Sequence, residues 1–407
     1  MQCSFKTPAA ATVMALWLAA ACAGEAADAG LAPLPAGLTL PPGFTGVVIA
    51  NVPRARELAI APNGDLFVGT EGSDVCVVTR ADAAGAAAPA RVFWRHPAYD
   101  NTGDAPNAGV AFSLAERALY VGANTSVWML AYRPGVKHPL SARKIVRVRT
   151  GRISPGNDGD VHETTSVAFS RGSLYVSVGS SCNVCAEVDA TRAVVLEFPA
   201  TGGRPLTKAT RIRNAIALTV NPSSGHVWIG DAGQDDLPFG HPYEFADDLS
   251  AHPGRADYGW PDCEEHHVAY VGGARCESVV VPLVELPAYS TIIGATFYPH
   301  NERGKFAFPK RYRGALFLAA HGSWHRRPDG AYAAAPQVVY VPMRGDRPVT
   351  PVDWADPDVQ WRTFLSGFQQ HGTARIGRPT GVTIGPEGSL FIADDQTGNI
   401  YRIRPTP

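Results

Sequence analysis

The sequence lacks an excess of charge of either sign, and this absence excludes several classes of partner. Lys and Arg number 36 and Asp and Glu number 37, so the 407-residue chain has a net charge of −1. It has no basic run of the kind that binds a phosphate backbone, so nucleic acid is not an expected partner. No apolar run reaches the ~18–20 residues that a membrane-spanning helix needs. Hydrophobic residues make up 45% of the chain, which is typical of a globular protein.

The longest apolar run lies near the N-terminus and is typical of a secretory signal peptide. It covers Ala9 to Ala23 and follows the basic residue Lys6. We therefore expect residues 1–23 to be removed on export, with the cleavage site undefined, and residues 33–407 to form one soluble domain in the periplasm or outside the cell. A lipid anchor at Cys22 is the less favoured alternative, because Leu18 lies one position too early for the usual lipidation pattern.

Few cysteines follow this leader, and four of them form two local pairs. Cys182 and Cys185 have a spacing shared by redox motifs, half zinc sites and short disulfide loops. No second pair has this spacing, and Ala186 rather than His follows Cys185, which excludes c-type haem attachment. A structural disulfide is the favoured interpretation. Cys263 and Cys276 are the second expected disulfide, because an exported protein meets an oxidising compartment.

A short repeat recurs six times along the chain. Each copy has an apolar stretch, a turn rich in Pro, Ser, Gly or Asn, and then Leu or Val, an aromatic residue and a third apolar residue. The six copies end at Val68, Val121, Val176, Ile229, Leu318 and Ile392. The first four copies are 53, 55 and 53 residues apart, and the later gaps of 89 and 74 residues leave room for inserted loops.

Each copy predicts a β-hairpin, because neither of its apolar stretches has the 3.6-residue period of a helix. A further short strand follows most copies and extends the hairpin into a small sheet. One such sheet cannot bury both of its faces, but six arranged radially can. The sequence therefore predicts an all-β protein, a six-bladed β-propeller with four-stranded antiparallel blades. A β-sandwich is the alternative, and the regular spacing of the copies disfavours it.

Polar residues stand just before or after several copies, where the loops of a propeller meet over its central channel. Before the copies lie His162, Arg213, Asn214 and Arg378, and after them lie Asp231, Gly233 and His321. Each of these alone is more often an ordinary loop residue. Their equivalent placement in different blades favours a shared binding site.

Five motifs follow one another along the chain: Tyr175 to Cys185, Arg213-Asn214, Tyr258 to Pro261, His321 to Trp324, and Gly377 to Pro379. In this order they resemble the glucose/sorbosone dehydrogenase family, and the sorbosone-dehydrogenase-like branch matches best. The resemblance covers about Leu40 to Arg404. It implies an exported six-bladed propeller that uses pyrroloquinoline quinone (PQQ) and calcium, Ca²⁺, to oxidise a sugar.

The resemblance also implies roles for individual residues. His162 matches the family's catalytic histidine, a base that takes the proton of a sugar hydroxyl. Arg213 and Asn214 match a pair that donates hydrogen bonds to the quinone oxygens. Arg378 matches an arginine that faces the cofactor and could pair with a carboxylate. Arg326 is expected to be a second cationic contact.

The expected calcium site lies in the loop after the fourth copy. Gly233 and Gln234 match positions where the family offers carbonyl oxygens, the kind of ligand that calcium prefers. Asp231, Asp235 and Asp236 would attract a cation to this loop, although an acidic surface turn would look the same. In the family the quinone supplies the redox chemistry and calcium polarises it.

Three places depart from the family's pattern, one of them the segment Asp231 to Asp235, where the family more often has Asp-Asn-Gly-Arg-Asp. Thr165 stands where an arginine is common, and Glu57 stands where an amide or another neutral residue is common. Two other functions therefore stay open: a non-catalytic ligand-binding propeller, and a calcium-dependent lactonase-like hydrolase. The substrate, an aldose or a sorbosone-like sugar, and the external electron acceptor follow from the resemblance alone.

Overall fold

The computed structural model describes residues 31–97, 106–148, 161–162, 165–235, 237, 240–264, 266–370 and 374–406. These residues form strands and loops, and their only helical segments are the short 3-10 turns Leu249–Ala251, Lys310–Tyr312 and Pro357–Gln360. None of the described helical segments has the length and hydropathy needed to span a membrane. The expected signal peptide, with Cys22, lies outside the described residues.

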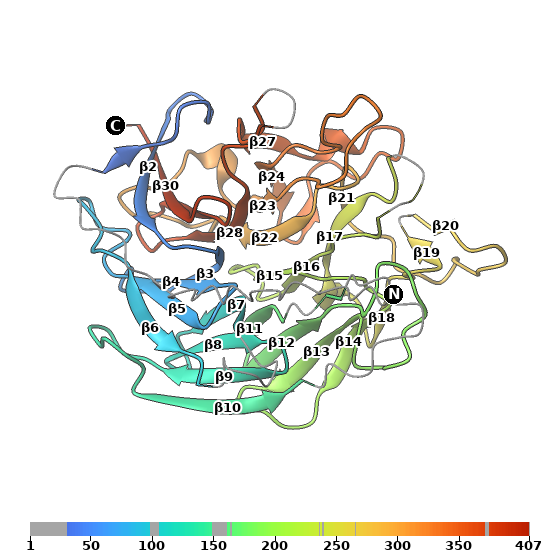
Figure 1. Cartoon of the computed structure of the whole chain (residues 1–407), viewed down its shortest axis with the longest axis horizontal. Helices are drawn as coiled ribbons and strands as arrows, with labels where there is room; N and C mark the ends of the chain where they lie inside the picture. Colours follow the sequence, from blue (N-terminus) through green and yellow to red (C-terminus); the bar gives the residue numbers. More distant parts are fainter. Residues whose placement is uncertain are drawn as a thin grey trace, which may run out of the picture.

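Six sheets stand around a common axis, as Figure 1 shows. Their innermost strands are β3 (Ala55–Ile60), β7 (Pro106–Ser113), β11 (Val167–Ser170), β15 (Ala217–Val220), β22 (Ile292–Phe297) and β28 (Pro379–Ile384). Each innermost strand contacts those of both neighbouring sheets, so the ring is closed. The predicted six-bladed β-propeller is confirmed.

Each sheet continues outward from its innermost strand. The first sheet adds β4 (Leu66–Thr70), β5 (Asp74–Val78) and β6 (Arg91–Arg95), and the second adds β8 (Ala118–Ala123), β9 (Ser126–Ala131) and β10 (Ser141–Arg147). The third adds β12 (Ser173–Val178), β13 (Val194–Pro199), β14 (Leu206–Thr210) and β18 (Ala256–Asp257), which runs parallel to β14. The fourth adds β16 (Val227–Gly230), β17 (Glu244–Asp248) and β21 (Val284–Leu286), and the fifth adds β23 (Leu316–Ala320), β24 (Gln337–Val341) and β27 (Arg362–Leu365). Two small hairpins pair β19 (Cys263–Glu264) with β20 (Val268–Ala269) and β25 (Met343–Arg344) with β26 (Arg347–Pro348).

The sixth sheet joins the two ends of the described chain. It runs from β28 through β29 (Leu390–Asp394) and β30 (Asn399–Pro405) to β2 (Phe44–Asn51) and β1 (Ala32–Pro33). Strands β2 and β30 are antiparallel, and Phe44 lies opposite Pro405. The ring is therefore closed by a strand from the start of the chain.

The last three residues of each repeat copy lie on the second strand of a sheet: β4, β8, β12, β16, β23 or β29. In every copy the aromatic residue packs in the hydrophobic cluster between its own sheet and the next one. These aromatic residues are Phe67, Tyr120, Tyr175, Trp228, Phe317 and Phe391, and all but Tyr175 are fully buried. Aromatic side chains bury a large area each, so one ring per interface holds neighbouring blades together.

The innermost strands line a channel on the ring axis that encloses about 210 Å³. Glu57 lies on its wall, and burial raises the pKa of this carboxyl to about 8. Thr165 is fully buried, and its carbonyl oxygen lies so close to Gly109 and Gly122 that a Cβ at either position would come within 2.2 and 1.9 Å of it. Glu57 therefore belongs to the channel wall, and Thr165 belongs to the packing around the innermost strands.

Candidate functional site

A second cavity of about 240 Å³ lies where the innermost strands begin, and it shares Ile216 with the channel. Three arginines, two histidines and an asparagine line it: Arg56, Arg213, Arg378, His162, His321 and Asn214. Asp235 and Glu244 supply acidic groups on one wall. Strand ends and loops of five different sheets therefore bring cations, imidazoles and carboxylates into one space. Neither Glu57 nor Thr165 is among the lining residues.

His162 is held in one tautomer by Ser180, which lies two residues after β12. Its Nδ1 lies 2.7 Å from the hydroxyl of Ser180, and that hydroxyl donates to the carbonyl oxygen of Cys182 at 2.7 Å. A serine hydroxyl has one proton to donate, so Nδ1 of His162 must be the donor in this pair. The neutral ring then carries its lone pair on Nε2, the form that a general base requires.

Arg213 and Asn214 precede β15 and are almost fully buried. The Arg213 guanidinium donates to the carbonyl oxygens of Asn183 and Ala232, each at 3.2 Å, and to Oδ1 of Asn183 at 2.9 Å. The backbone N–H of Asn214 donates to Asp231 Oδ1 at 2.7 Å. The predicted pair therefore reaches the cavity and also fixes the loop after β16.

That loop and β17 form the acidic wall of the cavity. Burial raises the pKa of Asp231 to about 6 and that of Glu244 to about 8, although Glu244 accepts the N–H of Ile292 at 3.1 Å. Gly233 lines the cavity beside Asp235. Gln234 is 2% exposed, and its Oε1 accepts no hydrogen bond from any described residue. Buried carboxyls with raised pKa values and an unpaired amide oxygen are groups that a bound cation would satisfy.

The opposite wall is organised around Asp395. Its two oxygens lie 3.0 and 2.9 Å from Nε2 of His321, and one of them pairs with Arg56 at 2.9 Å. Arg378 donates to the carbonyl oxygens of His321 and Gly322 at 3.1 and 2.6 Å. Burial lowers the pKa of His321 to about 4, partly offset by Asp395. This wall presents two cations: backbone carbonyl oxygens hold Arg378, and the carboxylates of Asp395 and Glu71 hold Arg56.

Arg326 does not line the cavity, so its predicted role as a second cationic contact needs correction. The chain turns at Gly322, where φ is 78°, and the next residues fold into an exposed hairpin. There Arg326 stacks on Tyr332, with 4.7 Å between the guanidinium and the ring centroid, and donates to the carbonyl oxygen of Gly330. Arg56 lines the cavity instead.

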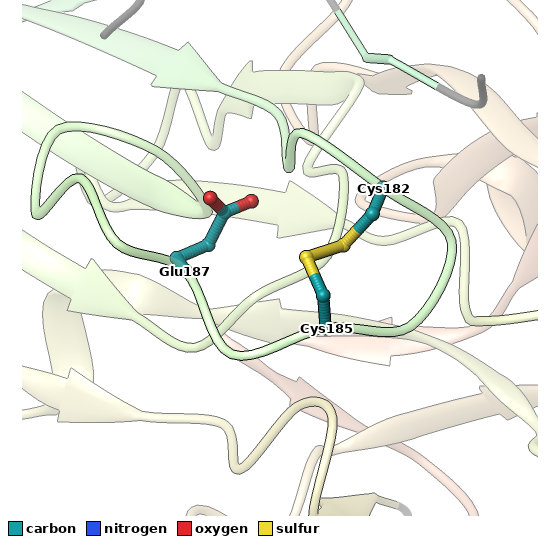
Figure 2. A group of neighbouring side chains, drawn as sticks. All are labelled: Cys182, Cys185 and Glu187. Carbon is teal, nitrogen blue, oxygen red and sulfur yellow. A yellow bond between two sulfur atoms is a disulfide. The ribbon is translucent and has the colours of Figure 1, made fainter. Parts of the chain in front are cut away.

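Both predicted disulfides are present. Cys182 is bonded to Cys185, as Figure 2 shows, and Cys263 is bonded to Cys276. Because the first two sulfurs are bonded to each other, they are not the thiolates that a half zinc site needs. Glu187 lies beside this disulfide and accepts the hydroxyl of Ser181 at 2.8 Å.

The lining fits the two groups that the family resemblance implies. PQQ is a planar, anionic tricarboxylate with quinone oxygens, and guanidinium and amide groups are matched donors for such a molecule. The acidic wall fits calcium, because it offers oxygen ligands and buried carboxyls. Trp324 is 65% exposed and lines the cavity, where its ring could meet a flat ligand, whereas Trp260 is 2% exposed and packs against Cys182.

Three residues of the site were not singled out from the sequence: Arg56, Glu244 and Asp395. Arg56 stands directly before the first repeat, as Arg378 stands before the last one, so the same placement rule could have found it. Asp395 follows the sixth repeat much as Asp231 follows the fourth. Glu244 lies at the start of a third strand, and nothing in the repeat pattern points to it.

Known proteins resemble this chain in sequence and in fold. A sequence model of the family described as TrAA12-like matches residues 38–266 and 262–406. The holo PQQ domain of a pyranose dehydrogenase from Coprinopsis cinerea has a TM-score of 0.73 at 19% identity, covering 92% of this chain and 98% of that one. The calcium structure of a carbohydrate-active enzyme of family AA12 from Trichoderma reesei has a TM-score of 0.74 at 18% identity, covering 93% and 100%. An uncharacterised protein of Borreliella burgdorferi is 26% identical over 257 residues, which span 62% of each chain. The chain thus has the fold of PQQ-type sugar dehydrogenases.

Proposed function

Because this chain belongs to the TrAA12-like family, we propose that it is a PQQ-dependent dehydrogenase that oxidises a sugar, an aldose or a sorbosone-like aldehyde. One observation carries the proposal. Three arginines, an amide and a histidine with its Nε2 lone pair converge on one cavity that also holds the carboxyls of Asp235 and Glu244. Export to the periplasm or medium, an external electron acceptor and calcium as a second bound group belong to the same proposal.

Each group of residues has its own task in this reaction. When bound, the quinone would accept the hydride from the sugar carbon. His162 Nε2 takes the proton of the sugar hydroxyl as that carbon is oxidised, and Ser180 keeps the lone pair on the correct nitrogen. Arg56 and Arg378 bind carboxylates of the cofactor, and Arg213 and Asn214 donate toward its oxygens. Gly233 and Gln234, with the carboxyls beside them, would hold calcium.

The two other functions have less support from the site. A calcium-dependent lactonase-like hydrolase needs metal ligands from several blades, whereas Asp235 and Glu244, the carboxylates in the described lining, come from one sheet and its loop. A non-catalytic binding propeller was suggested by Glu57 and Thr165. Both lie outside the cavity lining, so they leave its donor set intact.

The test is binding and turnover with matched arginine variants. The purified mature protein should bind PQQ saturably with calcium present and then reduce a dye at the expense of an aldose or sorbosone. Arg378→Ala should weaken PQQ binding by about 10- to 100-fold, because a charge-assisted pair is lost. Arg326→Ala, on the exposed hairpin, should change it by less than about twofold. Absence of saturable PQQ binding in the wild type would refute the proposal and favour a hydrolase or a binding scaffold.

A further inference from the structure

The loop closed by the first disulfide lies directly behind the candidate site. This loop, residues 182–185, lies within the connection between β12 and β13 and is referred to below as the disulfide loop. Its sulfurs pack against Trp260 and Ala193, so one side of the loop is buried. Figure 2 shows the short span that the S–S bond closes, with Glu187 beside it.

Asn183 in this loop contacts two other parts of the site. Its Oδ1 accepts Nη2 of Arg213 at 2.9 Å and the backbone N–H of Asp235 at 2.8 Å. Its Nδ2 donates to the carbonyl oxygen of Asp235 at 3.2 Å. Its own carbonyl oxygen accepts Nε of Arg213 and Nε1 of Trp260, each at 3.2 Å. A single residue that is 6% exposed therefore joins an arginine of the cavity to the acidic loop.

The same loop also reaches the histidine side of the cavity. The carbonyl oxygen of Cys182 accepts the hydroxyl proton of Ser180, and this bond makes Ser180 an acceptor for His162 Nδ1. The disulfide loop thus holds the neighbours of both His162 and Arg213. No residue of the loop is among those that line the cavity, so its effect on a ligand is indirect.

We propose that the disulfide loop is a positioning device in which Asn183 fixes Arg213 and the loop at residues 231–235 before any ligand arrives. An arginine side chain has many rotamers, and ordering it at the moment of binding would weaken the complex. Asn183 lowers this entropic cost, because its carbonyl oxygen and its Oδ1 accept Nε and Nη2 of Arg213 and so fix the orientation of the guanidinium. The disulfide keeps those acceptors in place, since the S–S bond restricts the conformations open to the four residues that it joins. The role in cofactor binding rests on the proposed function, but the positioning itself does not.

The experiment compares four variants of the full mature protein with the wild type. Asn183→Ala removes the side-chain hydrogen bonds of Asn183 and leaves the disulfide intact. Asn183→Asp keeps the Oδ1 acceptor. Cys182→Ser with Cys185→Ser removes the cross-link. Cys263→Ser with Cys276→Ser is the matched control, because it removes the other disulfide, whose residues do not line the cavity. Amide hydrogen exchange of the apo protein and PQQ affinity at saturating calcium are measured for each.

Asn183→Ala and the first double variant should speed exchange at Asp235 by at least about tenfold, because its N–H loses the Asn183 acceptor. Their PQQ dissociation constants should rise by about 10- to 100-fold, the effect of losing hydrogen bonds that order a charged group. Asn183→Asp should bind PQQ more tightly than Asn183→Ala. The control double variant should leave both readouts within about twofold of the wild type.

Two results would overturn the proposal. One is unchanged exchange at residues 231–235 in Asn183→Ala, and the other is wild-type PQQ affinity in that variant. If the wild type itself binds no PQQ, the proposed function fails while the exchange measurement still decides whether Asn183 positions the loop. If the first double variant does not fold, Asn183→Ala carries the test alone, because its disulfide is retained.

Discussion

The two histidines that face the cavity are held by different chemical groups. His162 donates from Nδ1 to the neutral hydroxyl of Ser180 at 2.7 Å, whereas His321 points Nε2 at both oxygens of Asp395. His321 is buried between Arg56 and Arg378, and burial is the main reason that its pKa falls to about 4. Two histidines that face one cavity can therefore have different roles, and the residue type alone does not identify the base. His162 has the surroundings of a base, while His321 belongs to a network that fixes two arginines.

The largest effect should come from removing the base. His162→Ala is expected to lower kcat of sugar oxidation by about 10²- to 10⁴-fold, the usual contribution of a positioned general base. Its PQQ affinity should stay within about threefold of the wild type, because the arginines are unchanged. Steady-state dye reduction and a PQQ titration measure the two quantities. A variant with a rate within tenfold of the wild type would move the base to another residue, with His321 as the first candidate.

The next effect concerns the contribution of the network around His321 to the stability of the protein. Asp395→Asn removes the charge that pairs with Arg56 and faces His321. Arg56 then keeps its ion pair with Glu71, at 3.0 Å, so losing one charge-assisted hydrogen bond should cost about 1.5–3 kcal/mol. Asp329→Asn is the matched control, because Asp329 pairs with Arg327 on the surface and should change stability by less than about 0.5 kcal/mol. Urea unfolding at pH 7 measures both. Equal midpoints in the two variants would contradict the proposed importance of the Asp395 network.

A third effect distinguishes the histidines by pH. His321 has a depressed pKa of about 4 in the folded state, against about 6.5 in an unfolded chain, so it stabilises the protein above pH 6.5 and this contribution is lost as the pH falls toward 4. The free energy of unfolding should therefore fall with a slope of up to about 1.4 kcal/mol per pH unit from this residue. His321→Gln should flatten the dependence. Parallel curves for the wild type and the variant, from urea titrations between pH 4 and 7.5, would argue against it.

The smallest effect tests the tautomer of His162. Ser180→Ala should lower kcat/KM by about 3- to 10-fold, because one hydrogen bond no longer selects the Nδ1–H form. Ser180→Thr keeps the hydroxyl and should restore most of the rate. The acid limb of the pH–rate profile should also shift in Ser180→Ala, which a merely structural change would not produce. An unshifted profile with wild-type kcat/KM would show that Ser180 does not set the tautomer.

The architecture could be predicted because its signal is local and repeated. Leu66-Phe67-Val68 and its five relatives each place an aromatic ring at a blade interface, and that requirement recurs with the spacing of the blades. The loop residues His162, Arg213, Asn214, Gly233 and Arg378 were predicted by placement and by family resemblance, and all five line the cavity.

Contacts between segments that are distant in the sequence could not be predicted. Arg56 and Asp395 are 339 positions apart, and only closure of the ring brings them together. Arg326 shows the opposite error, in which closeness in the sequence predicts a contact that the fold does not make. It is close in sequence to His321, but the hairpin after Gly322 directs its side chain to Tyr332 rather than to the cavity.

The pairing of β2 with β30 has a consequence for how this chain must fold. The sixth sheet contains strands from both ends of the described chain. The ring of six sheets therefore cannot close until β2 and β30 are both present. The entropy of joining such distant segments grows only with the logarithm of their separation, so the thermodynamic cost is modest. The kinetic cost is larger, because contacts between remote residues form slowly. Arg56 belongs to the first sheet and Asp395 to the sixth, so their ion pair, which organises one wall of the cavity, forms only when the ring closes.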